Sequence, residues 1–157
     1  MNKLTLLRSL TEELRTIDGG TSIQTAHLPG PKQYTFNTDC HENCFPSYKF
    51  LYERNDFPTI CFYIVEEAFR EAEAGIRYKT ATFNLRGYVH EDLGEDEDST
   101  WWAEALLDDI EHVLNNLKNR VDCLIDVRLL QLSTDEGVMS PYGVADMIFT
   151  ITYESEL

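Results

Sequence analysis

Apolar residues recur at helical spacing near the start of the chain. The repeating positions are Leu7, Leu10, Leu14 and Ile17, with Leu6 widening the stripe. Spacings of three and four residues place such side chains on one face of an amphipathic helix. Gly19 and Gly20 interrupt the pattern, and glycine is common just beyond a helix end. We therefore predict a helix of about 16 residues that lays one face on a sheet.

A second helical pattern, over about residues 100–119, is the clearest in the chain. Its apolar stripe consists of Trp102, Leu106, Ile110, Val113 and Leu117. Ser99 or Thr100 is the expected N-cap, and the late position of Lys118 and Arg120 suits the helix dipole. No second histidine or cysteine stands four residues before or after His112, which indicates a surface histidine rather than a metal ligand. The stripe should be buried against a sheet.

Two patterns between the helices predict strands. Residues 57–67 form an almost continuous apolar run entered through Pro58, as in a strand buried on both faces. Residues 78–90 alternate instead, which gives one core face and one polar face. The expected core positions of this second strand are Ala81, Phe83, Leu85, Gly87 and Val89. Residues 66–77 fit either a short helical turn or an extended hairpin connection.

The end of the chain predicts a long hairpin. Its first strand lies within residues 122–134, with Cys123, Ile125, Val127 and Leu129 on one face. Its second strand places Ala145, Met147, Phe149, Ile151 and Tyr153 on one face. Residues 135–143 contain the glycines and proline of a turn.

These elements predict an α+β fold, with a mainly antiparallel or mixed sheet of about four main strands packed by two helices. The length of 157 residues suits a single domain spanning residues 1–157. Residues 21–56 show no sustained period and predict a long irregular loop, with one short strand expected within Tyr48–Tyr52. This loop is rich in aromatic residues, so it either covers its own core or meets a partner.

The net charge of the chain argues against two classes of partner. The chain has 28 acidic and 13 basic residues, a formal net charge of −15. Binding to nucleic acid or to an anionic membrane needs clustered cations, so this balance argues against both. The leucine run near the amino terminus is interrupted by Arg8, Glu12 and Glu13, unlike a signal peptide, and no segment is long enough to span a membrane. We expect a protein made in a reducing cytoplasm.

The segment CHENC, residues 40–44, is a candidate metal or redox site. His41 or His27 could act as a further metal ligand beside Cys40 and Cys44. Zinc sites usually need two close ligand pairs, however, and the sequence has only one such pair. No flanking cation is placed to lower a thiol pKa. We therefore expect no metal and no cofactor, with Cys40 and Cys44 in a polar loop. Cys61 and Cys123 lie in apolar runs and are expected to be core residues.

No catalytic motif is present. Six of the eight residues from 91 to 98 are acidic, but they lack the spacing of a calcium-binding loop and indicate a solvated loop. Asp122, Asp126 and Arg128 are a conceivable carboxylate nuclease site. No lysine, however, stands at a spacing that would place it beside these carboxylates to assist catalysis. The sequence predicts that the protein is not an enzyme.

The order of these patterns resembles the tail terminator proteins of long, non-contractile bacteriophage tails. The resemblance rests on the first helix and on the stretches DFPTICFYI, YKTATFNLRGYV, WWAEALLDDIEHVL and TDEGVMSPYGVADMIFTITYE. It covers residues 1–18 and about 57–157. It implies a small non-enzymatic protein that forms a six-fold ring on the completed tail tube, stops tube growth and meets the head connector.

The same resemblance implies the partners: other copies of the chain in a hexamer, the tail tube protein and a head-completion or connector protein. It places the protein in the virion after synthesis in the host cytoplasm. DNA would pass through the ring without specific binding, and an acidic lumen would repel its phosphates. The alternatives are an acidic DNA mimic that inhibits a host DNA-binding enzyme, or another neck or tail-completion protein.

The tip of the last hairpin is the candidate interface with other subunits or the tail tube. Its expected residues are Asp135, Glu136, Met139 and Tyr142. Val138 adds a further apolar side chain, and a mixture of apolar and charged groups is typical of recognition surfaces. The alternative is an ordinary turn whose Val138 or Tyr142 folds back on the sheet. The irregular segment at residues 21–57, with its many aromatic side chains, is the second candidate.

Overall fold

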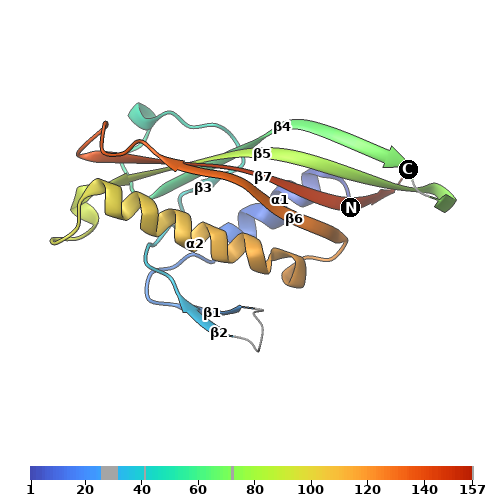
Figure 1. Ribbon diagram of the computed structural model, residues 1–157, viewed down its shortest axis with the longest axis horizontal. Coiled ribbons are helices and arrows are strands. Elements are labelled where there is room, and N and C mark those ends of the chain that lie inside the picture. Colours follow the sequence, from blue (N-terminus) through green and yellow to red (C-terminus); the bar gives the residue numbers. More distant parts are fainter. Residues whose placement is uncertain (26–31, 41, 72, 157) are drawn as a thin grey trace.

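The computed structural model describes residues 1–25, 32–40, 42–71 and 73–156 and confirms the α+β fold. Five strands form one sheet in the order β3-β4-β5-β7-β6. Their bounds are β3 Cys44–Phe45, β4 Thr59–Glu71, β5 Ile76–His90, β6 Leu124–Thr134 and β7 Tyr142–Glu156. The two helices, α1 (Lys3–Leu14) and α2 (Ser99–Arg120), lie on the same side of this sheet (Figure 1).

The helices are placed as predicted, with small differences at their ends. α1 ends at Leu14, so it is shorter than expected, although Ile17 beyond it is still buried. The N-cap of α2 is Asp98 rather than Ser99 or Thr100, because the Asp98 carboxylate accepts a hydrogen bond from Trp101 N at 2.9 Å. A carboxylate is as good a cap as a hydroxyl and also favours the positive end of the helix dipole.

The strand pair β4–β5 agrees with the alternation in β5 but only partly with the buried run in β4. Residues Thr59–Phe62 are buried, whereas Tyr63 and Val65 are 37% and 52% exposed. The chain after β3 covers only the first part of the outer face of β4, so burial on both faces stops there. The undecided segment between the strands is a hairpin connection that contains the short 3-10 helix η2, Glu73–Gly75.

The predicted faces of the last hairpin are confirmed for β7 and wrong for the start of β6. Cys123 is exposed and Ile125 is 41% exposed, whereas Leu124 is buried. A bulge between Leu124 and Asp126 shifts the alternation by one residue. Such a shift moves side chains to the other face, so Leu124 reaches the core and Val127 packs against it.

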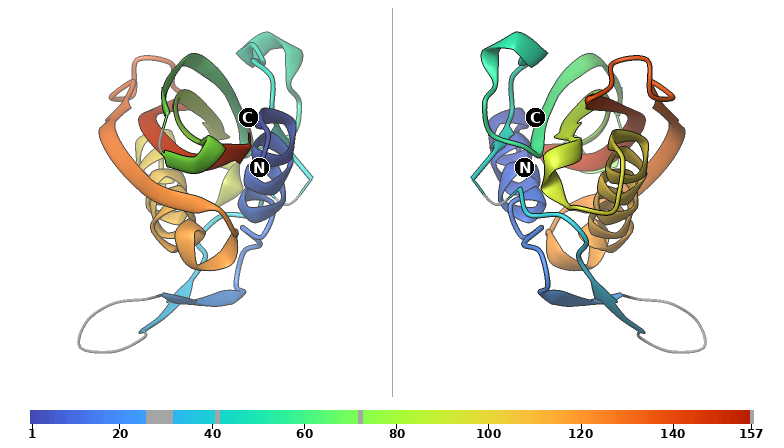
Figure 2. Two further views of the ribbon diagram at one scale, coloured as in Figure 1. Left: turned by 90° about the vertical axis from the view of Figure 1, so that its right-hand side faces the viewer. Right: turned by 90° about the vertical axis from the view of Figure 1, so that its left-hand side faces the viewer.

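The long loop predicted for residues 21–56 contains regular structure. β1 (Ser22–Thr25) and β2 (Lys32–Thr35) pair antiparallel as a separate two-stranded arm that projects from the body (Figures 1 and 2). β3 pairs in parallel with β4. The strand expected within Tyr48–Tyr52 is absent, because this stretch leads into the 3-10 helix η1, Leu51–Glu53.

One core joins both helices to the inner face of the sheet. Phe83 of β5 stacks on Phe149 of β7, with 5.0 Å between ring centroids. α2 approaches β5 so closely that a Cβ built on Gly87 would lie 2.5 Å from Leu106 Cδ2. The glycine is therefore required by packing rather than by a turn.

Candidate interaction surface

The tip of the β6–β7 hairpin is held together by one of the predicted interface residues. Asp135 Oδ2 accepts a hydrogen bond from Met139 N at 2.8 Å, and Asp135 Oδ1 accepts one from Val144 N at 3.1 Å. Glu136 follows with a φ of 55°, in the left-handed region. The Asp135 carboxylate thus shapes the turn, and Glu136 lies exposed at its tip.

The apolar side chains of this tip divide into two groups. Val138 is 82% exposed and Met139 is 45% exposed. Tyr142 instead turns back to the body, where its ring lies 4.8 Å from His90 and 5.6 Å from Phe57, between ring centroids. The exposed apolar surface of the tip therefore consists of Val138 and Met139, without Tyr142.

A second exposed apolar surface is the aromatic loop, residues 48–52. The Tyr48, Phe50 and Tyr52 rings are 36%, 47% and 83% exposed. They form a chain of contacts, with centroid distances of 4.8 Å and 5.5 Å. This loop lies on the outer face of the sheet, because Tyr48 also contacts Tyr63 of β4.

Polar side chains of β5 and β7 fix this loop to the sheet. Tyr88 Oη donates a hydrogen bond of 2.6 Å to the Lys49 carbonyl, and Arg86 donates one of 3.0 Å to Tyr48 Oη. Arg86 is also bidentate with Asp146, at 2.7 Å and 3.2 Å. The hydrogen bond to Asp146 raises the pKa of Arg86 above its ordinary value. The Tyr48 ring and the Lys49 backbone are thus attached to the sheet.

The cysteines of the CHENC segment lie in the core and not in a polar loop. Cys40 and Cys44 are both fully buried. Their burial raises the thiol pKa in both cases, to about 12 for Cys44. His41 and His27 lie outside the described residues, and within the described ranges no three histidine, cysteine or acidic residues are grouped to hold a metal ion. The sequence interpretation was also wrong for Cys123, which is exposed.

This burial predicts a clear difference in thiol reactivity. At pH 8 in native protein, a thiol reagent should label Cys123 rapidly and leave Cys40, Cys44 and Cys61 unreacted, since buried neutral thiols are inert. Mass spectrometry of the labelled peptides measures this directly. A Cys123→Ser variant is the control and should show no rapid labelling. Rapid labelling of Cys40 or Cys44 in that variant would contradict the buried placement.

The base of the arm is held by Asp109, a residue that sequence reasoning missed. Asp109 lies fully buried on α2. Its carboxylate accepts hydrogen bonds from Tyr34 Oη at 2.6 Å, Thr38 Oγ1 at 2.6 Å and Thr38 N at 2.8 Å. Asn37 N donates a further bond of 3.0 Å. The position of Asp109 in the sequence could have revealed this role. It is an acidic residue on the apolar stripe of the helix, three residues after Leu106 and four before Val113.

Ring stacking strengthens this attachment. The Tyr34 ring lies parallel to His112 of α2, with 3.6 Å between centroids. Burial, followed by the hydrogen bond to Asp109, raises the pKa of Tyr34, so it stays a hydrogen-bond donor. His112, expected as a surface residue, therefore supports the arm.

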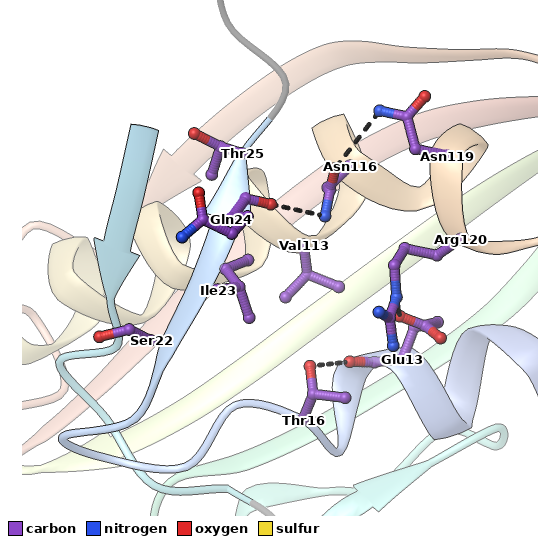
Figure 3. A pocket seen from close by; sticks show the side chains of 10 residues that line it. All are labelled: Glu13, Thr16, Ser22, Ile23, Gln24, Thr25, Val113, Asn116, Asn119 and Arg120. Carbon is purple, nitrogen blue, oxygen red and sulfur yellow. Dashed lines mark hydrogen bonds and ion pairs between the residues drawn. The ribbon is translucent and has the colours of Figure 1, made fainter. Parts of the chain in front are cut away.

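A groove of about 550 Å³ separates β1 from the two helices (Figure 3). Ile23 and Val113 point into it, and Asn116 Nδ2 donates a hydrogen bond of 3.1 Å to the Gln24 carbonyl at its edge. At the other end Arg120 pairs with Glu13 at 3.3 Å. Apart from this ion pair its lining is neutral, so the groove does not select a charged ligand.

The carboxylates considered for catalysis lie at and just before the start of β6. Asp126 accepts a hydrogen bond of 2.6 Å from Arg128 Nε on the outer face of β6. Asp122 is exposed ahead of that strand. The Asp126 carboxylate is thus held by a neighbouring arginine on an open surface and not in a cleft.

Comparison with known protein families identifies a family that this chain matches. A family model described as Bacteriophage Tail Tube Terminator Protein matches residues 21–157. No curated protein matches the chain. In the part of the chain that is described, no helix is both long and apolar enough to cross a membrane. The match includes the sheet, α2, the arm and both exposed apolar surfaces, so the chain belongs to the bacteriophage tail tube terminator family.

Proposed function

We propose that this protein caps the end of the phage tail tube as a closed ring of its own copies, most simply a hexamer. The ring stops tube polymerisation and offers the surface that meets the head connector. The family match over residues 21–157 carries this proposal. The role is structural, not enzymatic, and its place is the virion.

The charge of the chain supports a ring through which DNA passes. The net charge of −15 would repel phosphates wherever acidic side chains face the lumen, on the scale of a Debye length of about 8 Å in physiological salt. DNA would therefore move through without binding to a specific site.

A closed ring needs a heterologous interface, in which two different surfaces of each copy meet. The tip of the β6–β7 hairpin supplies one candidate contact, either with a neighbouring copy or with the tail tube. Asp135 holds this turn in shape, while Glu136, Val138 and Met139 are exposed on it. Tyr142 belongs to the proposed site because its ring packs on His90 and Phe57 and so attaches the tip to the body.

Replacing both Val138 and Met139 with serine tests the tip. Both side chains are exposed, so the stability of the subunit should change by less than about 0.5 kcal/mol. Capping of purified tail tubes should weaken, with tubes growing beyond their normal length in electron micrographs. Leu4→Ser, which removes an apolar side chain that is 70% exposed on α1, is the control and should cap normally. Normal tube length with the double variant would exclude the tip.

The same assay tests the proposed function as a whole. Wild-type protein added to polymerising tube protein should appear as a ring at one end of each tube and fix the tube length. Tubes that grow equally with and without the protein would rule the capping role out.

A further inference from the structure

The exposed apolar side chains of the large sheet lie on its two outermost long strands. They are Tyr63, Val65 and Phe69 on β4, and Ile125, Leu130 and Leu132 on β6, between 37% and 65% exposed. No large hydrophobic residue of the two central strands, β5 and β7, is exposed to this degree among the described residues. The sheet is therefore apolar along both margins.

Both margins also carry unpaired backbone. Among the residues that the structure describes, β6 pairs only with β7, and β3 pairs with β4 only at Ile60 and Cys61. Within the described residues, β4 therefore has an open edge from Phe62 to its end at Glu71. Figure 1 shows β4 and β6 on either side of β5 and β7. Open edges are templates for pairing with another strand.

The two open edges match in length. Cross-strand pairing places Leu132, Met147, Leu85 and Phe62 in one row across the sheet. It places Leu124, Tyr153, Lys79 and Phe69 in another. The stretch of β6 between these rows therefore corresponds to the stretch of β4 that β3 leaves uncovered.

The directions of the strands also match. The pairs β4–β5, β5–β7 and β7–β6 are all antiparallel, so four strands alternate and β4 runs opposite to β6. Copies related by rotation about one axis keep the same orientation to that axis. When such copies stand side by side, β6 of one meets β4 of the next as an antiparallel pair, which is the ladder that this sheet already uses.

One row carries opposite charges at its two ends. Glu66 of β4, Thr82 of β5, Thr150 of β7 and Arg128 of β6 are directly paired across the sheet. Glu66 is exposed, and the Arg128 side chain is 73% exposed, with its Nε bound to Asp126 of the same strand at 2.6 Å. If the rows continue from one copy to the next, Arg128 of one copy faces Glu66 of its neighbour. We call these four residues the charged row.

Accepting the ring proposed above, we propose that its subunits join edge to edge, with β6 of each copy paired antiparallel to the free part of β4 in the next. Arg128 and Glu66 face each other across this contact and set its register. The apolar side chains at both margins are covered by the pairing, and each copy uses one edge for each neighbour, so that the ring closes without an unpaired long edge.

Charge reversal tests this contact. Arg128→Glu and Glu66→Arg should each raise the protein concentration needed for half-maximal ring formation by about tenfold or more, since like charges then meet across the interface. The double variant should recover most of the wild-type value. Analytical ultracentrifugation measures the assembly, and circular dichroism confirms that each variant is folded. Lys118→Glu, an exposed reversal on α2, is the control for net charge.

The outcomes separate this inference from the capping role. If the wild-type protein forms rings and both single variants assemble equally well, the edge contact is overturned and the capping role stays intact. If the single variants form normal rings but no longer cap tubes, the edge contact is also overturned. The edges of β4 and β6 would then contact the tube protein instead of a neighbouring copy. Wild-type protein that neither forms rings nor caps tubes would overturn both proposals. Recovery in the double variant, and not in the single variants, supports the edge contact.

Discussion

Replacing Leu106 with alanine is expected to lower the free energy of unfolding by about 2 to 5 kcal/mol, the range for truncation of a buried leucine. Leu106 is fully buried on α2, and its Cδ2 atom packs directly over Gly87 of β5. Ile110→Ala should have a similar effect, because Ile110 is also fully buried. Chemical denaturation monitored by circular dichroism measures both changes. An unchanged midpoint in both variants would contradict the packing of α2 on the sheet.

The contact with Gly87 gives this prediction an internal control. Gly87→Ala alone should destabilise by about 1 to 3 kcal/mol, since its Cβ would lie 2.5 Å from Leu106 Cδ2. In the Leu106→Ala background the added methyl enters the space left by the leucine. The two changes together should therefore cost less than their sum. Strict additivity would mean that the two residues do not touch.

Replacing Asp109 with alanine is expected to lower the free energy of unfolding by about 3 kcal/mol or more. The change leaves buried donors without an acceptor, among them Thr38 N and Thr38 Oγ1, and each such group costs about 1 to 3 kcal/mol. Asp109→Asn keeps the shape but presents an NH2 group to some of the same donors, so it should also destabilise. Thermal and chemical unfolding measure both variants.

The neighbouring acid provides the matched comparison. The Asp108 side chain is 51% exposed, and its carboxylate lies 2.9 Å from Tyr34 Oη, whose hydroxyl also reaches Asp109 at 2.6 Å, and 3.7 Å from His112 Nδ1. Asp108→Ala should change stability by less than about 1 kcal/mol. Amide hydrogen exchange should rise at residues 34–38 in the Asp109 variant and stay near wild type in the Asp108 variant. Equal effects of the two substitutions would exclude the special role of Asp109 in holding the arm.

The local patterns of the chain were enough to predict the elements of the core. The stripes of α1 and α2 and the alternation in β5 and β7 are confirmed, because their periods match the geometry of one buried face. The family resemblance was likewise readable from these stretches. None of this depends on contacts between residues that are distant in the sequence.

The interface side of the protein was only partly predictable. The turn at residues 135–143 was located correctly, but its sequence does not show that Tyr142 packs on His90 and Phe57 while Val138 and Met139 stay exposed. That division depends on what the fold brings behind the turn. The proposed edge contact, too, depends on strand order, which periodicity alone does not reveal.

The sequence by itself thus determined the two helices and the four long strands β4, β5, β6 and β7, and the apolar faces of α1, α2, β5 and β7. The tertiary structure decided the rest: that Asp109 completes the base of an arm, that Cys40 and Cys44 are buried, and that a bulge turns Leu124 inward. The physical reason is that a buried polar or irregular position is stabilised by partners far along the chain. Asp109 meets Thr38, 71 residues earlier, only when the chain is folded.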